Sequence, residues 1–188
     1  IYNNLKDLLK TLSFFNQNSC IKIDTIEIFV ETDLDLSPSV FGLIKNLHKL
    51  DLVGLSSTNL LPHDLSNLKA LEKLSFGLSK LETIDSFSFK NLYNLTHLDL
   101  STNRIFIINK SSLDGLINVK FLDLSENNLN SIEAGAFDNL KKLEILKLNK
   151  NQLVKLEKSL FSNLIRLKEL NLNSNEIVFL DHYLLDGL

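Results

Sequence analysis

Cysteine is almost absent from this chain of 188 residues, since Cys20 is the only one. A single thiol cannot close a disulfide within the chain, so no disulfide framework holds the fold together. Proline and glycine are also scarce, at two and six residues. No stretch approaches about 18 uninterrupted apolar residues, so we expect no direct insertion into a membrane.

The chain has no excess of positive charge. Its 20 Lys and Arg residues stand against 23 Asp and Glu, a formal net charge of −3. This balance gives no electrostatic reason to expect a nucleic acid partner, and no polybasic run predicts a membrane surface. Hydrophobic content of 44% and charged content of 23% are typical of a soluble globular protein.

Catalytic motifs are missing as well. The four histidines lie in different parts of the chain without metal-ligand spacing, and no cysteine accompanies them. There is no G-x-S-x-G, no glycine-rich phosphate loop and no H-E-x-x-H. The sequence therefore predicts no enzyme, no cofactor and no metal site.

Leucine and asparagine recur at regular intervals instead. One pattern repeats every 24 residues from residue 23 to residue 188 without a gap, as Leu143-x-x-Leu146-x-Leu148-x-x-Asn151-x-Leu153 illustrates. The copies start at Ile23, Leu47, Leu71, Leu95, Val119, Leu143 and Leu167. A period in the twenties with this spacing is the signature of a leucine-rich repeat.

The spacing within each copy predicts its structure. Leu146 and Leu148 differ by two positions, so both face one side of a short strand, and successive strands stack in parallel about 4.8 Å apart. The later apolar residues carry the return path and fill the interior; the position near the end of the copy holds Phe41, Leu65, Phe89, Leu113, Phe137, Phe161 and Leu185. We therefore predict an α/β solenoid, a right-handed superhelical arc of about seven coils with a parallel β-sheet on its concave face.

An asparagine follows the strand in four consecutive copies: Asn103, Asn127, Asn151 and Asn175. The chain turns there and leaves backbone N–H and C=O groups that need partners. A side-chain amide both donates and accepts, so stacked asparagines are expected to form a hydrogen-bonded ladder. Leu55 holds this position in the copy that starts at Leu47, and we predict an irregular, less rigid backbone around residues 53–60.

Residues 1–22 stand outside the repeat. Leu5, Leu8, Leu9 and Leu12 have helical spacing, so we expect a short amphipathic helix that caps the repeat domain of residues 23–188. At the other end the chain stops on a core position, Leu188, without a polar cap. We expect the chain to be part of a longer protein.

The 24-residue unit with Phe near its end, as in Ile132-Glu133-Ala134-Gly135-Ala136-Phe137, resembles the "typical" class of leucine-rich repeats. That class occurs in extracellular animal proteins such as Toll and Toll-like receptors, insect leucine-rich immune proteins, adhesion receptors and matrix proteoglycans. The resemblance implies non-catalytic recognition of a protein or peptide ligand, with innate immune recognition as the first expectation. A structural or adhesion role and an intracellular scaffold are the alternatives, and dimerisation stays open.

Disulfide-bonded caps are usual in that class, whereas this chain has Cys20 alone. Cys20 precedes the first strand, where the resemblance implies a cap cysteine whose partner lies outside this chain. A small buried apolar residue is the alternative interpretation.

Register identifies the side chains on the concave face. Its central column is Glu27, Asp51, Ser75, Asp99, Asp123, Lys147 and Asn171. The column before it is Thr25, Lys49, Lys73, His97, Phe121, Ile145 and Glu169. Binding is expected at seven residues of these two columns: Asp51, His97, Asp99, Phe121, Asp123, Ile145 and Lys147.

Two features of this face are candidate binding elements. Asp99 and Asp123 are expected on adjacent strands, where their like charges repel each other and would be neutralised by a cationic group of a partner. The alternative is that Lys73 and Lys147 neutralise them in ion pairs within the chain. Phe121 and Ile145 form an apolar pair that would anchor a partner, with His97 and Asp123 as its polar rim. The alternative is that they are two ordinary apolar residues on the surface.

Two glycosylation sequons occur, Asn94-Leu95-Thr96 and Asn109-Lys110-Ser111. They fit the extracellular or cell-surface location that the resemblance implies. Chance gives a few such matches in a chain this rich in Asn, Ser and Thr, so a cytoplasmic location is the alternative.

Overall fold

A computed structural model describes residues 24–29, 46–62, 64–181 and 183–185. The helix expected within residues 1–22, and Cys20, lie outside this part of the chain. Eleven strands are described: β1 (Thr25–Phe29), β2 (Lys49–Val53), β3 (Asn59–Leu60), β4 (Lys73–Ser75), β5 (Thr83–Ile84), β6 (His97–Asp99), β7 (Ile107–Ile108), β8 (Phe121–Asp123), β9 (Ser131–Ile132), β10 (Ile145–Lys147) and β11 (Glu169–Asn171).

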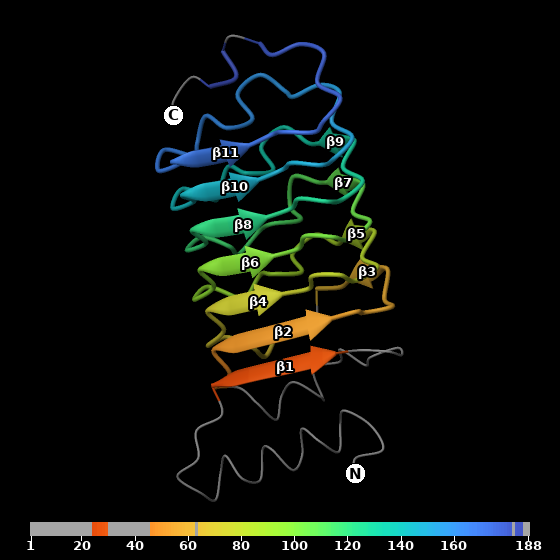
Figure 1. Cartoon of the computed structure of the whole chain (residues 1–188). Helices are drawn as coiled ribbons and strands as arrows, with labels where there is room; N and C mark the ends of the chain where they lie inside the picture. The colour runs from red at the N-terminus through yellow and green to blue at the C-terminus, as the bar shows by residue number, and fades with distance from the viewer. Residues whose placement is uncertain (1–23, 30–45, 63, 182, 186–188) are drawn as a thin grey trace, which may run out of the picture.

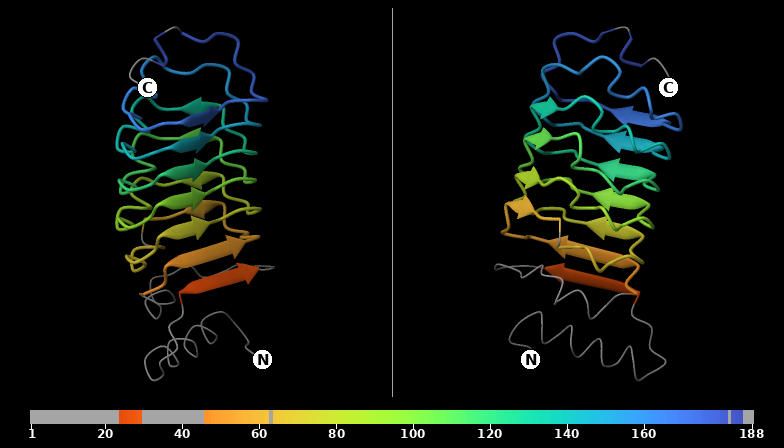
Figure 2. Two further views of the ribbon diagram at one scale, coloured as in Figure 1. Left: turned by 60° about the vertical axis from the view of Figure 1, so that its left-hand side comes forward. Right: turned by 180° about the vertical axis from the view of Figure 1, so that it is seen from behind.

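The strands build a solenoid of stacked coils (Figure 1). One seven-stranded parallel sheet has the order β1-β2-β4-β6-β8-β10-β11, with one strand from each coil. The two-residue strands pair as β3-β5 and β7-β9, and Figure 2 shows them stacked along another side of the coils. The predicted solenoid with a parallel sheet is confirmed. Among the described residues no segment is helical, and turns and short strands form the return path.

The core lies between the sheet and the return path. In β2, for example, Leu50 and Leu52 are fully buried while the alternate residues reach the sheet surface. Phe137 and Phe161 stack in adjacent coils with ring centroids 6.1 Å apart. The core position predicted for Leu185 is wrong, because Leu184 is buried and Leu185 is 55% exposed. No further coil of the described chain lies over it.

A ladder of side-chain amides joins the coils behind the sheet. Asn127 is typical: its Oδ1 accepts from the Ile105 N–H at 3.0 Å, and its Nδ2 donates to the Leu100 carbonyl at 2.9 Å and the Leu124 carbonyl at 3.2 Å. Asn103, Asn151 and Asn175 make the equivalent bonds. Each amide therefore connects its own turn to the coil before it.

One left-handed residue recurs in the turn after each strand of the seven-stranded sheet from β2 to β11. Positive φ is found at Gly54, Leu78, Thr102, Glu126, Lys150 and Ser174, which are 24 residues apart. Such a conformation costs a non-glycine residue about 1 kcal/mol or more. At Thr102, Glu126 and Lys150 the backbone N–H donates to the next coil, as that of Glu126 does to the Asn149 carbonyl at 3.0 Å, and this bond favours the conformation.

The turn at Leu55 differs in its hydrogen bonds. Ser79 Oγ accepts from the Leu55 N–H at 3.0 Å, and the Lys80 N–H donates to the Leu55 carbonyl at 2.9 Å. In later coils the carbonyl that accepts the equivalent N–H belongs to a residue two positions further along the repeat. The Leu81 carbonyl, for example, accepts from the Arg104 N–H. The hydrogen-bond register of this turn is therefore irregular, as expected, while Gly54 keeps the left-handed conformation found in the other turns. Lower rigidity around residues 53–60 stays a prediction.

Candidate functional site

The sheet register aligns the two predicted columns. His97 pairs with Phe121 and Phe121 with Ile145, while Asp99 pairs with Asp123 and Asp123 with Lys147. In the same central column Asp51 pairs with Ser75. The strands thus bring all seven binding candidates to one face, in two adjacent columns.

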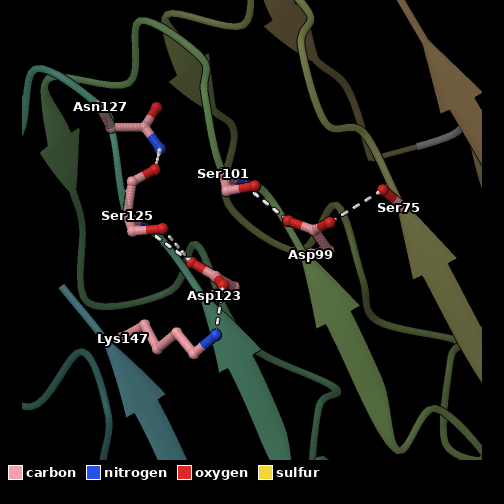
Figure 3. Close-up of polar contacts among 7 residues, drawn as sticks. All are labelled: Ser75, Asp99, Ser101, Asp123, Ser125, Asn127 and Lys147. Carbon is pink, nitrogen blue, oxygen red and sulfur yellow. Dashed lines mark hydrogen bonds and ion pairs between the residues drawn. The ribbon is translucent and has the colours of Figure 1, made fainter. Parts of the chain in front are cut away.

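Most side chains of the central column have a local structural role. Each accepts a hydrogen bond from the backbone N–H two residues later, as Asp99 Oδ1 does from Ser101 at 2.9 Å (Figure 3). The pairs are Ser75–Gly77, Asp99–Ser101, Asp123–Ser125 and Asn171–Asn173. A short acceptor side chain therefore caps the end of each of these strands, which explains part of the acidic column without a ligand.

The aspartates of this column differ in their cationic partners. Lys147 Nζ lies 3.3 Å from Asp123 Oδ2, and Asp123 is 8% exposed. Lys49 Nζ lies 2.7 Å from Asp51 Oδ2 and 3.4 Å from Glu27 Oε1. Its hydrogen bond to Asp51 raises the pKa of Lys49. Within the described residues, Asp99 has no cation within 4.0 Å, so the alternative of an ion pair with Lys73 is wrong, while that of Lys147 with Asp123 is confirmed.

Phe121 is surrounded by polar groups on the sheet face. His97 stacks on its ring with centroids 5.9 Å apart and planes at 27°. Lys147 Nζ lies 5.1 Å from the ring centroid, a cation–π contact. Phe121 and Ile145 are both half-buried, so part of each apolar surface stays open to solvent.

The His97 ring is hydrogen-bonded to its neighbour in the sequence. Thr96 Oγ1 lies 3.0 Å from the Glu72 carbonyl and 2.8 Å from His97 Nδ1, which orients the ring on the sheet face. Partial burial, with the charges of Lys73 and Lys120, lowers the pKa of His97 below its ordinary value of 6.5.

We expect the titration of His97 to be visible by NMR. Its midpoint should lie below 6.5, and Lys73→Gln should raise it without restoring the ordinary value, because burial is the larger cause. Since the folded chain holds this proton more weakly than the unfolded chain, His97 lowers stability as pH falls below 6.5, and its effect is absent above that pH. A midpoint at or above 6.5 in the wild-type chain would contradict this geometry.

A hollow of about 370 Å³ lies on the sheet face. Its lining comes from five strands, β1, β2, β4, β6 and β8. Asp51, His97, Asp99 and Phe121 contribute to it, whereas Asp123, Ile145 and Lys147 lie beyond its edge. Sequence reasoning missed Lys49 and Lys73 as site residues, although both stand in the column that includes His97.

The two sequon asparagines lie away from the strands of the large sheet. Asn94 is exposed and its Nδ2 donates to the Lys69 carbonyl at 2.9 Å. Asn109 follows β7 and is half-buried. Asn94 precedes β6, and Asn109 precedes the turn after β7. The backbone of both segments is hydrogen-bonded to a neighbouring coil.

In the described part of the chain, no three His, Cys, Asp or Glu side chains gather in a way that would hold a metal ion. In the same residues, no helix has the length and apolar character needed to cross a membrane.

Comparisons with known proteins give two similarities. A family model described as "Leucine rich repeat" matches residues 70–129, 94–153 and 141–188. No curated protein matches the chain. The crystal structure of a TLR13–ssRNA13 complex is similar, with 32% sequence identity and a TM-score of 0.67. The match covers 79% of this chain and 21% of that chain, so this chain spans about a fifth of the TLR13 chain's length.

Proposed function

Because the chain belongs to the leucine-rich repeat family, we propose that it recognises a protein or peptide ligand with the exposed face of its seven-stranded sheet. The observation that carries this proposal is the hollow of about 370 Å³, which combines charged and aromatic side chains from five strands. Binding sites of about this size commonly mix an apolar surface with a few placed polar groups. The ladder and the continuous core hold these side chains in place, so little ordering entropy is lost on binding.

The similarity to TLR13 supports a role in innate immune recognition, as part of an extracellular receptor or secreted binding protein. The single-stranded RNA in that structure is a ligand of TLR13. For this chain, the net charge of −3 and the aspartates on the sheet face favour a protein or peptide over a nucleic acid.

A matched pair of phenylalanine variants tests the sheet face as the binding surface. Phe121→Ala should weaken retention of ligand from an extract of the native source about tenfold or more, as truncation of an aromatic anchor does. Phe106→Ala is the control, because Phe106 is 41% exposed and precedes β7, outside the large sheet. Quantitative mass spectrometry of the proteins retained by each immobilised variant gives the measurement. Equal retention by both variants would argue against the sheet face.

Mass spectrometry of the native protein tests its location. We expect N-linked glycan on Asn94 or Asn109, removable by glycosidase, because secretion exposes both sequons to the glycosylation machinery. Asn94 is the better acceptor, since it is exposed while Asn109 is half-buried. Unmodified sequons together with a free Cys20 thiol would favour the intracellular scaffold instead.

A further inference from the structure

The hollow has a net negative charge near neutral pH. Glu27, Asp51 and Asp99 line it, against the two ammonium groups of Lys49 and Lys73. Three carboxylates and two cations leave one negative charge, because His97, with its lowered pKa, is neutral. A ligand group that enters the hollow therefore gains from being cationic.

Asp99 is the carboxylate of the hollow that has no ion pair with a described residue. Lys49 Nζ lies 2.7 Å from Asp51 and 3.4 Å from Glu27. Among the described residues Asp99 receives neutral donors, the Ser101 N–H on Oδ1 at 2.9 Å and the Ser75 hydroxyl on Oδ2 at 3.2 Å (Figure 3). Each carboxylate oxygen accepts one of these bonds and has the capacity for a second, which a guanidinium group with its several N–H donors would use.

Gly77 leaves space beside this carboxylate. In the coils of β2, β6 and β8 the equivalent position holds Val53, Ser101 and Ser125. A Cβ added to Gly77 would lie 3.7 Å from Asp99 Oδ2, so a side chain there would occupy the approach to this oxygen. Phe121, which is half-buried, lines the same hollow and offers apolar surface to a methylene stem.

We propose that this hollow binds an arginine side chain of the ligand, with its guanidinium on Asp99 beside Gly77 and its stem against Phe121. The proposal rests on the proposed function and names the chemistry that the sheet face recognises. Lys73 limits the affinity, because its charge lines the same hollow. Removing that charge should strengthen binding.

Two small peptides test this site directly: N-acetyl-leucyl-arginine amide and its citrulline counterpart, which has the same shape without the charge. In ¹⁵N–¹H NMR titrations the arginine peptide should shift the amides of Gly77 and Ser101 in a saturable way. The citrulline peptide should bind about fivefold or more weakly, since a charged hydrogen-bond pair is lost. Equal binding of both peptides, or no saturable shift with arginine, would overturn the proposal.

Four variants locate the interaction. Asp99→Asn should weaken the arginine peptide about tenfold, with the fold kept, because Asn171 accepts from the Asn173 N–H at 3.1 Å in the same column. Asp85→Asn is the matched control and should change binding less than about twofold, since Asp85 is exposed directly after β5, outside the large sheet. Gly77→Val should abolish binding by filling the approach, and Lys73→Gln should strengthen it about two- to threefold.

The outcomes separate this proposal from the proposed function. Equal effects of Asp99→Asn and Asp85→Asn, or weaker binding in Lys73→Gln, would contradict an arginine site at Asp99. Loss of native ligand in Phe121→Ala but not in Phe106→Ala would still support recognition by the sheet face. If neither Phe variant loses ligand while the peptide titration succeeds, the arginine site stands and sheet-face recognition of the native ligand is contradicted.

Discussion

Asn127→Leu is expected to lower the free energy of unfolding by about 3–5 kcal/mol. Asn127 is 6% exposed and satisfies the Ile105 N–H together with the carbonyls of Leu100, Leu124 and Ser125. Leucine has a similar size but leaves these backbone groups without their partner. Because each coil contacts only its neighbours, the loss should also separate the coils on either side into two less cooperative units.

Urea unfolding followed by circular dichroism measures this effect, and Asn128→Leu provides the control. Asn128 is the next residue in the sequence but is exposed, and its backbone N–H still donates to the Ile105 carbonyl at 3.0 Å. We expect the control to change stability by less than about 0.5 kcal/mol. If Asn127→Leu is as stable as the control, the amide ladder is not what joins the coils.

Gly115→Ala is expected to be the second strongly destabilising change, at about 3 kcal/mol or more. Gly115 has a φ of +99°, where side chains are strained. A Cβ would lie 2.3 Å from the Phe89 carbonyl oxygen and 2.7 Å from Lys90 Cα, which are backbone atoms of the preceding coil. The two coils would have to separate to admit it.

Gly77→Ala is the matched control for this change. There the nearest atoms to an added Cβ are Ser75 Oγ at 3.5 Å and Asp99 Oδ2 at 3.7 Å, which are ordinary contacts. Its effect should stay within about 0.5 kcal/mol of the wild type. Thermal unfolding of both variants under the same conditions gives the comparison, and similar melting temperatures would contradict the close approach at Gly115.

Much of this architecture could be predicted because each copy repeats one set of local rules. Two leucines separated by two positions define a strand, and the 24-residue period places His97 beside Phe121 and Asp99 beside Asp123. The turn chemistry was harder to read. Thr102, Glu126 and Lys150 adopt a left-handed conformation that their residue types do not favour, so only the coil-to-coil hydrogen bonds reveal it.

The site was less predictable than the fold for a physical reason. The columns depend on backbone register, which the sequence pattern determines, whereas ion pairs depend on how long side chains bend. Lys147 reaches Asp123, as one of the two alternatives expected, but Lys73 does not come within 4.0 Å of Asp99. The arginine site proposed at Asp99 depends on this difference and on the missing side chain at Gly77, and neither follows from periodicity.

The central claim is that ligand binds on the face of the large sheet. Carbodiimide labelling of carboxylates, with and without the protein that the immobilised chain retains most strongly, tests it directly. We predict that ligand reduces labelling of Glu27, Asp51 and Asp99, while exposed Glu133 and Glu157, which lie outside the large sheet, keep theirs. Protection of Glu133 and Glu157 with unchanged labelling of the sheet-face carboxylates would contradict the claim.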